Sequence, residues 1–140
     1  MKVVLEEIIN ALFTADDNVD CYYDKKKHEV FVVADYIEYE MSEDELEEYL
    51  DSDDLLRLPS KYEIHEYKMM EEFIDTLTPS VAKEQLWEAI RGKGAFRRFK
   101  QCVNYHGIEK MWYHFHDEGY RKIAIDWCEA NHLEFKEKDD

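Results

Sequence analysis

The spacing of apolar residues changes along the chain, and this change constrains the fold more than any other feature. Residues 3–13 place apolar side chains at helical spacing, with polar residues between them, and this pattern predicts an amphipathic helix. Residues 19–23 and 29–34 are instead rich in β-branched and aromatic residues and flank a polar stretch, as in a β-hairpin. Since a lone hairpin is marginally stable in water, we expect it to pack on helices or to gain another strand.

Helical spacing returns in the second half of the chain. An apolar stripe predicts a helix over residues 64–77, Ser80 is placed to cap a second helix, and residues 95–105 form a third. Gly92 and Gly94 separate the second helix from the third. Glycine is the usual residue at such helix ends, so these three helices are expected to be distinct.

The last helical pattern runs from residue 108 to about residue 131. Gly119 lies inside it and is expected to weaken the helix or to split it in two, because glycine is a poor helix former. Residues 133–135 predict either a short tail strand or a docking segment.

These elements predict an α+β fold that is mainly helical, with an N-terminal helix and β-hairpin followed by a bundle of four to five helices. A length of 140 residues is typical of one domain, and no stretch has the composition of a long linker. We therefore expect a single domain over residues 1–140, with an acidic helix and hairpin portion over 1–60 and a helical portion over 61–135.

Acidic residues are concentrated in the first half. Residues 1–60 carry 18 of the 34 acids but only 5 of the 18 bases, so most of the net charge of -16 lies there. Such a charge argues against broad, non-specific binding to nucleic acid or membranes. Ser42 and Glu45 form a capping-box pattern that predicts a short helix through Leu50. We interpret the acidic stretch 35–54 as a solvated face; the alternative is that it imitates nucleic acid and engages a basic protein.

The cysteines and the N-terminus favour a reducing compartment. Cys21, Cys102 and Cys128 are odd in number, widely spaced and without a C-x-x-C pair, as expected of small buried side chains. The first residues meet acids too early for a signal peptide, and no apolar run approaches the roughly 18 residues of a membrane span. We expect a cytoplasmic protein with no membrane contact.

Two stretches of the second half carry a family resemblance. They are LPSKYEIHEYKMMEEFI at residues 58–74 and AIRGKGAFRRFK at residues 89–100, and Trp112-Tyr113 follows shortly after. Together they resemble an uncharacterised family of small bacterial proteins. The resemblance implies a bacterial cytoplasmic setting, and it implies no activity, cofactor or catalytic residue.

The segment from residue 91 to residue 100 is the main candidate site. No acid occurs between Glu88 and Glu109, whereas five bases do, and the glycines beside them expose backbone amides near a helix start. The hypothesis is a site for a phosphate group or an acidic partner. The alternative is that the aromatic residues are core, the glycines form a turn and the bases pair with the chain's own acids. The five candidate anion-binding residues are Arg91, Lys93, Arg97, Arg98 and Lys100.

A second group of residues allows a catalytic interpretation. His65, Glu66 and Glu71 lie on one predicted helix and could act as acid or base, although their spacing does not match a carboxylate-bridged metal site. Cys102 with His106, and Cys128 with His132, have the i, i+4 spacing of shared helix faces and leave a zinc site as a further alternative. We expect neither a metal nor a cofactor.

The preferred prediction is a non-catalytic binding or regulatory protein that contacts an anionic partner through residues 91–100. The partner would be a nucleic-acid phosphate, a phosphorylated ligand or an acidic protein. The alternative is a small phosphate-processing enzyme, nuclease-like or phosphatase-like, that uses His65, Glu66 or Glu71 beside Arg97 and Arg98. A cleft joining the two groups of residues would favour the enzyme, and a wide separation would favour the binding module.

Overall fold

The computed structural model describes residues 2–137, and the chain divides into two compact units. One unit contains the chain up to Ile64 and from Tyr120 onward, and the other contains His65–Gly119. The long helix α7 (Glu109–Ala130) contributes its first part to the second unit and its last part to the first. The expectation of a single domain stays a prediction, whereas the α+β, mainly helical fold class is confirmed.

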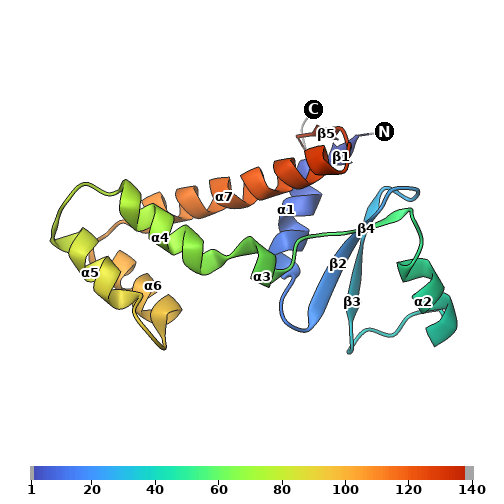
Figure 1. Cartoon of the computed structure of the whole chain (residues 1–140), viewed down its shortest axis with the longest axis horizontal. Coiled ribbons are helices and arrows are strands. Elements are labelled where there is room, and N and C mark those ends of the chain that lie inside the picture. The colour runs from blue at the N-terminus through green and yellow to red at the C-terminus, as the bar shows by residue number, and fades with distance from the viewer. Residues whose placement is uncertain (1, 138–140) are drawn as a thin grey trace. The chain divides into compact units, whose positions relative to one another are not determined.

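The first unit is built around a three-stranded antiparallel sheet (Figure 1). The predicted hairpin is present, and Tyr22 on its first strand pairs with Phe31 on its second. Tyr22 also pairs with Arg57, on a third strand that the sequence pattern did not reveal. The hairpin therefore gains a third strand, which is one of the two ways in which we expect a lone hairpin to be stabilised. The strands are β2 (Val19–Asp24), β3 (Glu29–Ala34) and β4 (Leu55–Arg57), in the order β3-β2-β4.

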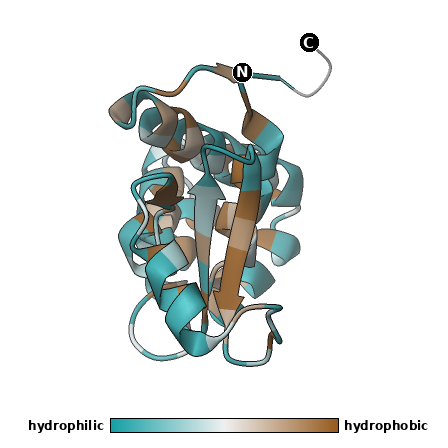
Figure 2. Cartoon of the chain, turned by 90° about the vertical axis from the view of Figure 1, so that its right-hand side faces the viewer, coloured by the Kyte–Doolittle hydropathy of each residue, from teal (hydrophilic) through white to brown (hydrophobic). Residues whose placement is uncertain are grey.

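The helix α1 (Leu5–Thr14) packs against the sheet through its apolar stripe, as the helical spacing predicts. Leu5, Ile8 and Leu12 are fully buried. In Figure 2 the strand β3 is coloured mostly brown, in keeping with its run of apolar residues. The edge of the Trp127 ring meets Tyr23 of β2 at a centroid distance of 6.3 Å, which brings the end of α7 into the core of this unit.

The acidic helix α2 (Glu43–Leu50) starts at the predicted capping box. Ser42 Oγ accepts a hydrogen bond from the Glu45 amide at 3.1 Å, and the Glu45 carboxylate accepts one from the Ser42 amide at 3.3 Å. Tyr49 then attaches the helix to the hairpin: its ring meets Phe31 edge to face at 4.9 Å, and its hydroxyl donates to Asp24 at 2.5 Å.

Asp24 also explains how the hairpin turns without a glycine. It is only 2% exposed, and its second carboxylate oxygen accepts hydrogen bonds from the amides of Lys26 and Lys27 at 2.9 Å each. His28 takes the left-handed conformation, with φ of 57°, that closes the turn. Burial raises the pKa of Asp24, but the hydrogen bonds from Tyr49 and from these two amides outweigh it, so the pKa is held below its ordinary value.

The two ends of the described chain meet in a second, two-stranded sheet. The strand β1 (Val3–Val4) pairs in parallel with β5 (Phe135–Lys136). The tail segment therefore does include a short strand, but the strand begins at Phe135, two residues after the start of the predicted range 133–135.

The second unit is a group of helices, visible in green, yellow and orange in Figure 1. The helices are α4 (Glu66–Thr76), α5 (Val81–Ala89), α6 (Ala95–Tyr105) and the first part of α7. The helices α4 and α6 each bury several apolar side chains, as their sequences predict, whereas α5 buries only Leu86 and leaves Val81 65% exposed. Ser80 caps α5 by accepting a hydrogen bond from the Lys83 amide at 3.2 Å.

Two helix boundaries differ from the sequence prediction. The helix expected from residue 64 begins at Glu66, because His65 adopts a left-handed φ of 57° after a separate short helix, α3 (Lys61–Ile64). Of the two alternatives expected at Gly119, a weakened helix or a split one, the split is wrong, because α7 is continuous over 22 residues. A Cβ atom at Gly119 would lie 3.3 Å from the Met69 methyl carbon, so the glycine allows close packing that offsets its cost of about 1 kcal/mol in helix propensity. Within residues 2–137, no helix has both the length and the apolar character that crossing a lipid bilayer requires.

We predict that Asp24→Asn lowers the free energy of unfolding at neutral pH by about 1–3 kcal/mol, because it weakens a buried, charge-assisted hydrogen-bond network. Since the pKa of Asp24 is lower in the folded than in the unfolded chain, its charge stabilises the fold at pH values above the pKa of about 3.9 that an aspartate has in an unfolded chain. This contribution is lost as the pH falls through the lower pKa of Asp24 in the folded chain. Urea unfolding at neutral and acidic pH should show the wild type losing more stability than the variant.

Asp20→Asn is the matched control, because Asp20 lies on the same strand but is half exposed and meets Arg57 only at 3.7 Å. We expect it to change stability by less than about 0.5 kcal/mol. An equal loss in both variants would contradict the role assigned to Asp24.

Candidate functional site

Arg98 fixes the turn between α5 and α6. Its Nε donates a hydrogen bond to the Ala89 carbonyl at 2.9 Å, and its two terminal nitrogens donate to the carbonyls of Arg91 and Lys93. These carbonyls belong to the end of α5 and the turn after it, where a helix leaves acceptors unsatisfied. Gly94, with φ of 77°, admits this arrangement, since a Cβ there would lie 3.0 Å from Arg98 Nη1.

The guanidinium group of Arg98 is therefore already bound to backbone, unlike those of its neighbours. Arg91 lies beside Glu88 at 3.5 Å in an exposed ion pair. Such a pair contributes little energy and leaves the arginine accessible.

Lys93, Arg97 and Lys100 form what we call the basic surface. All three are exposed, and none makes an ion pair with any residue of the described range 2–137. Arg97 and Lys100 are neighbours on α6 because residues three apart share a helix face. Arg98 holds the Lys93 carbonyl and so keeps Lys93 beside the first turn of that helix.

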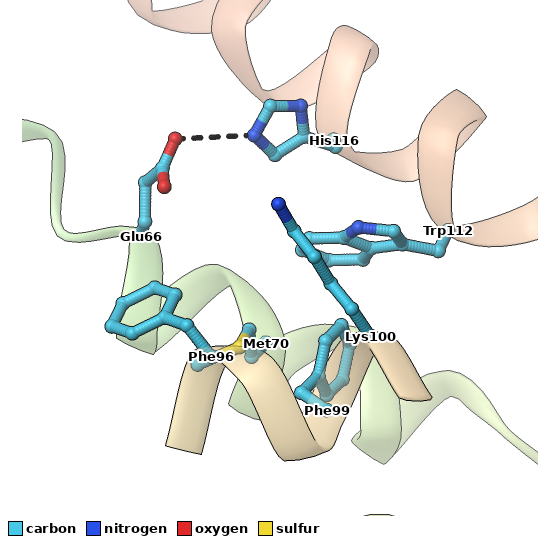
Figure 3. Close-up of a pocket in the computed structure, with 7 residues that line it drawn as sticks. All are labelled: Glu66, Met70, Phe96, Phe99, Lys100, Trp112 and His116. Atoms are coloured by element: carbon cyan, nitrogen blue, oxygen red, sulfur yellow. Dashed lines mark hydrogen bonds and ion pairs between the residues drawn. The ribbon is translucent and has the colours of Figure 1, made fainter. Parts of the chain in front are cut away.

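A pocket of about 160 Å³ lies within the second unit (Figure 3). Three helices contribute to it, each through residues at i, i+4 spacing on one face. Four of its seven lining residues are apolar or aromatic and three are ionisable. The Lys100 side chain reaches in from α6 with its amine directed toward His116. The lining residues are Glu66 and Met70 from α4, Phe96, Phe99 and Lys100 from α6, and Trp112 and His116 from α7.

A carboxylate–imidazole pair closes one side of this pocket. Glu66 Oε1 lies 3.2 Å from His116 Nε2, and the two side chains are 30% and 18% exposed. The other ring nitrogen of His116 lies 3.7 Å from Asp117. Both ring nitrogens of His116 therefore lie within 4 Å of a carboxylate oxygen.

The pocket joins parts of both groups of predicted residues. Glu66 and Lys100 line it together, whereas His65, Glu71 and the remaining bases do not. Sequence reasoning missed Trp112 and His116 as site residues. Their i, i+4 spacing places them on one face of α7, and their ring centroids lie 5.2 Å apart, so that spacing was the available signal.

The cysteine–histidine pairs do not form a metal site within the described part of the chain, which contains no group of three His, Cys, Asp or Glu side chains able to hold an ion. His106 contacts Gln85 at 2.6 Å. Burial raises the pKa of the Cys102 thiol. Burial and, to a smaller extent, the negative charge of the nearby Glu129 raise the pKa of the Cys128 thiol to about 11. Both groups are therefore thiols near neutral pH, and a thiol is a poor nucleophile and metal ligand.

Comparison with protein families matches residues 1–140 with the model described as "Uncharacterised protein family (UPF0158)". The chain belongs to UPF0158. The family resemblance inferred from the second half of the sequence is therefore confirmed, and membership brings no assigned reaction or ligand. No curated protein and no solved structure matched this UPF0158 member.

We predict that Arg98→Ala lowers the free energy of unfolding by about 1–3 kcal/mol, because it leaves carbonyls at the end of α5 without their donors. Arg97→Ala is the adjacent control and should change stability by less than about 0.5 kcal/mol. Urea unfolding of the two variants measures the difference. Equal destabilisation by both would show that Arg98 does not have the structural role assigned to it.

Proposed function

We propose that this UPF0158 member is a non-catalytic binding protein that contacts an anionic partner through the basic surface. One observation carries the proposal. In a chain with a net charge of -16 and 34 acids, Lys93, Arg97 and Lys100 remain exposed and without an acidic partner in the described range. The three bases lie in the segment between Glu88 and Glu109, which contains no acid, so no carboxylate nearby in the sequence offsets their charge. A group of bases in such a segment supports a contact with an external anion.

The local arrangement of the chain also supports binding. Arg98 fixes the turn through backbone carbonyls, so the neighbouring bases project from a rigid element. A rigid element loses less conformational entropy on binding than a mobile loop. Arg97 supplies a planar fork suited to a carboxylate or phosphate, and Lys100 supplies a compact charge beside it.

We further propose a bacterial cytoplasmic location. The three cysteines, Cys21, Cys102 and Cys128, are free, and two of them are buried. Unpaired cysteines are typical of a reducing compartment. The family resemblance inferred from the sequence favours the same setting.

We predict that Lys93→Glu combined with Arg97→Glu weakens binding to an anionic partner at least about tenfold, which corresponds to about 1.4 kcal/mol. Lys68→Glu combined with Lys110→Glu is the matched control, because these exposed lysines lie in the same unit and the variant has the same total charge. The assay is fluorescence anisotropy with a labelled polyglutamate peptide and a single-stranded oligonucleotide, and titration calorimetry with inorganic phosphate, each at several salt concentrations.

Salt-sensitive binding of one probe that only the first variant loses would support the proposal and would identify the class of anion. Binding that both variants lose equally would reflect total charge and would contradict a specific surface. Failure of every probe to bind the wild type would also overturn the proposal.

One observation favours a second candidate, the small phosphate-processing enzyme. Glu66 and Lys100 line the same pocket, so a cleft does join the two groups of residues. Against catalysis, Arg98 is bound to carbonyls, and His116 directs its Nε2 at Glu66. The pocket of about 160 Å³ is also smaller than the roughly 300–1,000 Å³ of ordinary small-molecule sites.

We expect no turnover of p-nitrophenyl phosphate above the rate in buffer, because the lining of the pocket that contains Glu66 and His116 includes no arginine to hold the phosphate. Release of p-nitrophenol measured by absorbance tests this, with Glu66→Gln as the companion variant. Turnover by the wild type that this variant abolishes would establish the enzyme in place of the binding protein.

A further inference from the structure

The pocket beside the basic surface has the size and lining of a site for one aromatic ring. A cavity of about 150 Å³ lined by apolar side chains binds benzene, so the volume of about 160 Å³ found here suits a group of that size. A nucleotide or a larger cofactor would not fit. The volume therefore restricts the occupant to a ring or a compact side chain.

The chemistry of the walls favours an aromatic occupant. Phe99 and Trp112 are almost completely buried and meet nearly edge to face at 4.7 Å, with an interplanar angle of 76°. Met70 adds a polarisable thioether to the same lining. Aromatic rings and methionine sulfur both make favourable contacts with an inserted ring.

Phe96 shows that this lining reaches solvent. Its side chain lines the pocket and is 48% exposed, so an aromatic group that enters the pocket could also cover Phe96. Lys100, one helical turn away on α6, provides a cation at the same position (Figure 3). An apolar rim next to a cation is suited to an aromatic group that is followed by a carboxylate.

The partner must extend beyond the pocket. Arg97 and Lys93 are exposed cations that do not line it, although Arg97 is three residues from Lys100 on the same helix. A ligand that filled only the pocket would leave both uncompensated. A polypeptide with acids on either side of one aromatic residue would satisfy all three bases together with the pocket.

We propose that the pocket and the basic surface form one docking site for an acidic polypeptide segment, with a single aromatic side chain of that segment inserted into the pocket against Phe96, Phe99 and Trp112. This proposal rests on the proposed function and names its partner class. Glu66 also lines the pocket, and its Oε1 lies 3.2 Å from His116 Nε2.

The test uses two labelled peptides and the full chain. One peptide has a phenylalanine flanked by glutamates, and the other has alanine in its place. We expect the phenylalanine peptide to bind about tenfold or more tightly, since burial of an aromatic side chain contributes that much. Phe96→Ala should reduce the difference between the peptides, whereas Tyr105→Ala, an 82% exposed aromatic on the same helix, should not.

Nuclear magnetic resonance gives a second readout. On addition of the phenylalanine peptide, the indole N–H signal of Trp112 should move and that of Trp87 should not, because only Trp112 lines the pocket. Trp112→Phe and Trp87→Phe assign the two signals.

Equal affinity of the two peptides would overturn the pocket part of the proposal. If the Lys93→Glu/Arg97→Glu variant lost both peptides in that case, the proposed function would stand alone. Equal binding of N-acetylphenylalanine amide and the phenylalanine peptide would overturn the role of the flanking acids. If neither peptide binds, this inference falls, and the proposed function then depends on the oligonucleotide and phosphate measurements.

Discussion

The contact of Phe73 with aromatic rings from two other helices holds the second unit together. Phe73 is 2% exposed, and its ring centroid lies 5.3 Å from Trp112 and 6.2 Å from Phe99. These contacts join α4, α7 and α6, and Phe99 and Trp112 also form the wall of the pocket. The wall of the pocket is thus made of side chains that also belong to the core of this unit. Its rim residues Phe96 and Lys100 can be changed with less structural cost than the wall itself.

Arg98 illustrates why adjacent residues of one type need not share a role. Arg97 and Arg98 follow each other in a basic segment, yet α6 directs them to different surroundings. Arg98 meets the end of α5, where carbonyls need donors, and its hydrogen bonds stabilise the turn that presents Lys93 and Arg97. Replacing both arginines at once would therefore mix loss of stability with loss of binding.

In the first unit, Asp24 combines local and long-range contacts in a similar way. Its carboxylate accepts hydrogen bonds from the amides of Lys26 and Lys27, which close the hairpin turn. It also accepts a hydrogen bond from the hydroxyl of Tyr49, which lies 25 residues further along the chain. A buried carboxylate that accepts several hydrogen bonds stabilises one arrangement of the chain, because a shift in strand register would leave its charge without hydrogen-bond donors. The acidic helix α2 is attached at this point, although most of its side chains face solvent.

Most of the secondary-structure elements could be predicted from the amino-acid sequence, because their signals are local. Periodicity located α1, the hairpin and the helices of the second half, and local chemistry located the caps at Ser42 and Ser80, because these signals depend on residues a few positions apart. It also showed that the acid-free segment around Arg97 is unusual and that the chain belongs with a known family. It gave no warning of the third strand β4, whose three residues are too few for a pattern.

The contacts between residues that are distant in the sequence could not be predicted in this way. Gly119 lies in a continuous helix because Met69 packs against it, and Glu66, Lys100 and His116 share a pocket because α4, α6 and α7 converge. Each helix face can be read from i, i+4 spacing, but the convergence of three faces depends on contacts between residues up to 50 positions apart. Such contacts depend on how the side chains of different helices pack together, and a single sequence does not specify that packing by any local pattern.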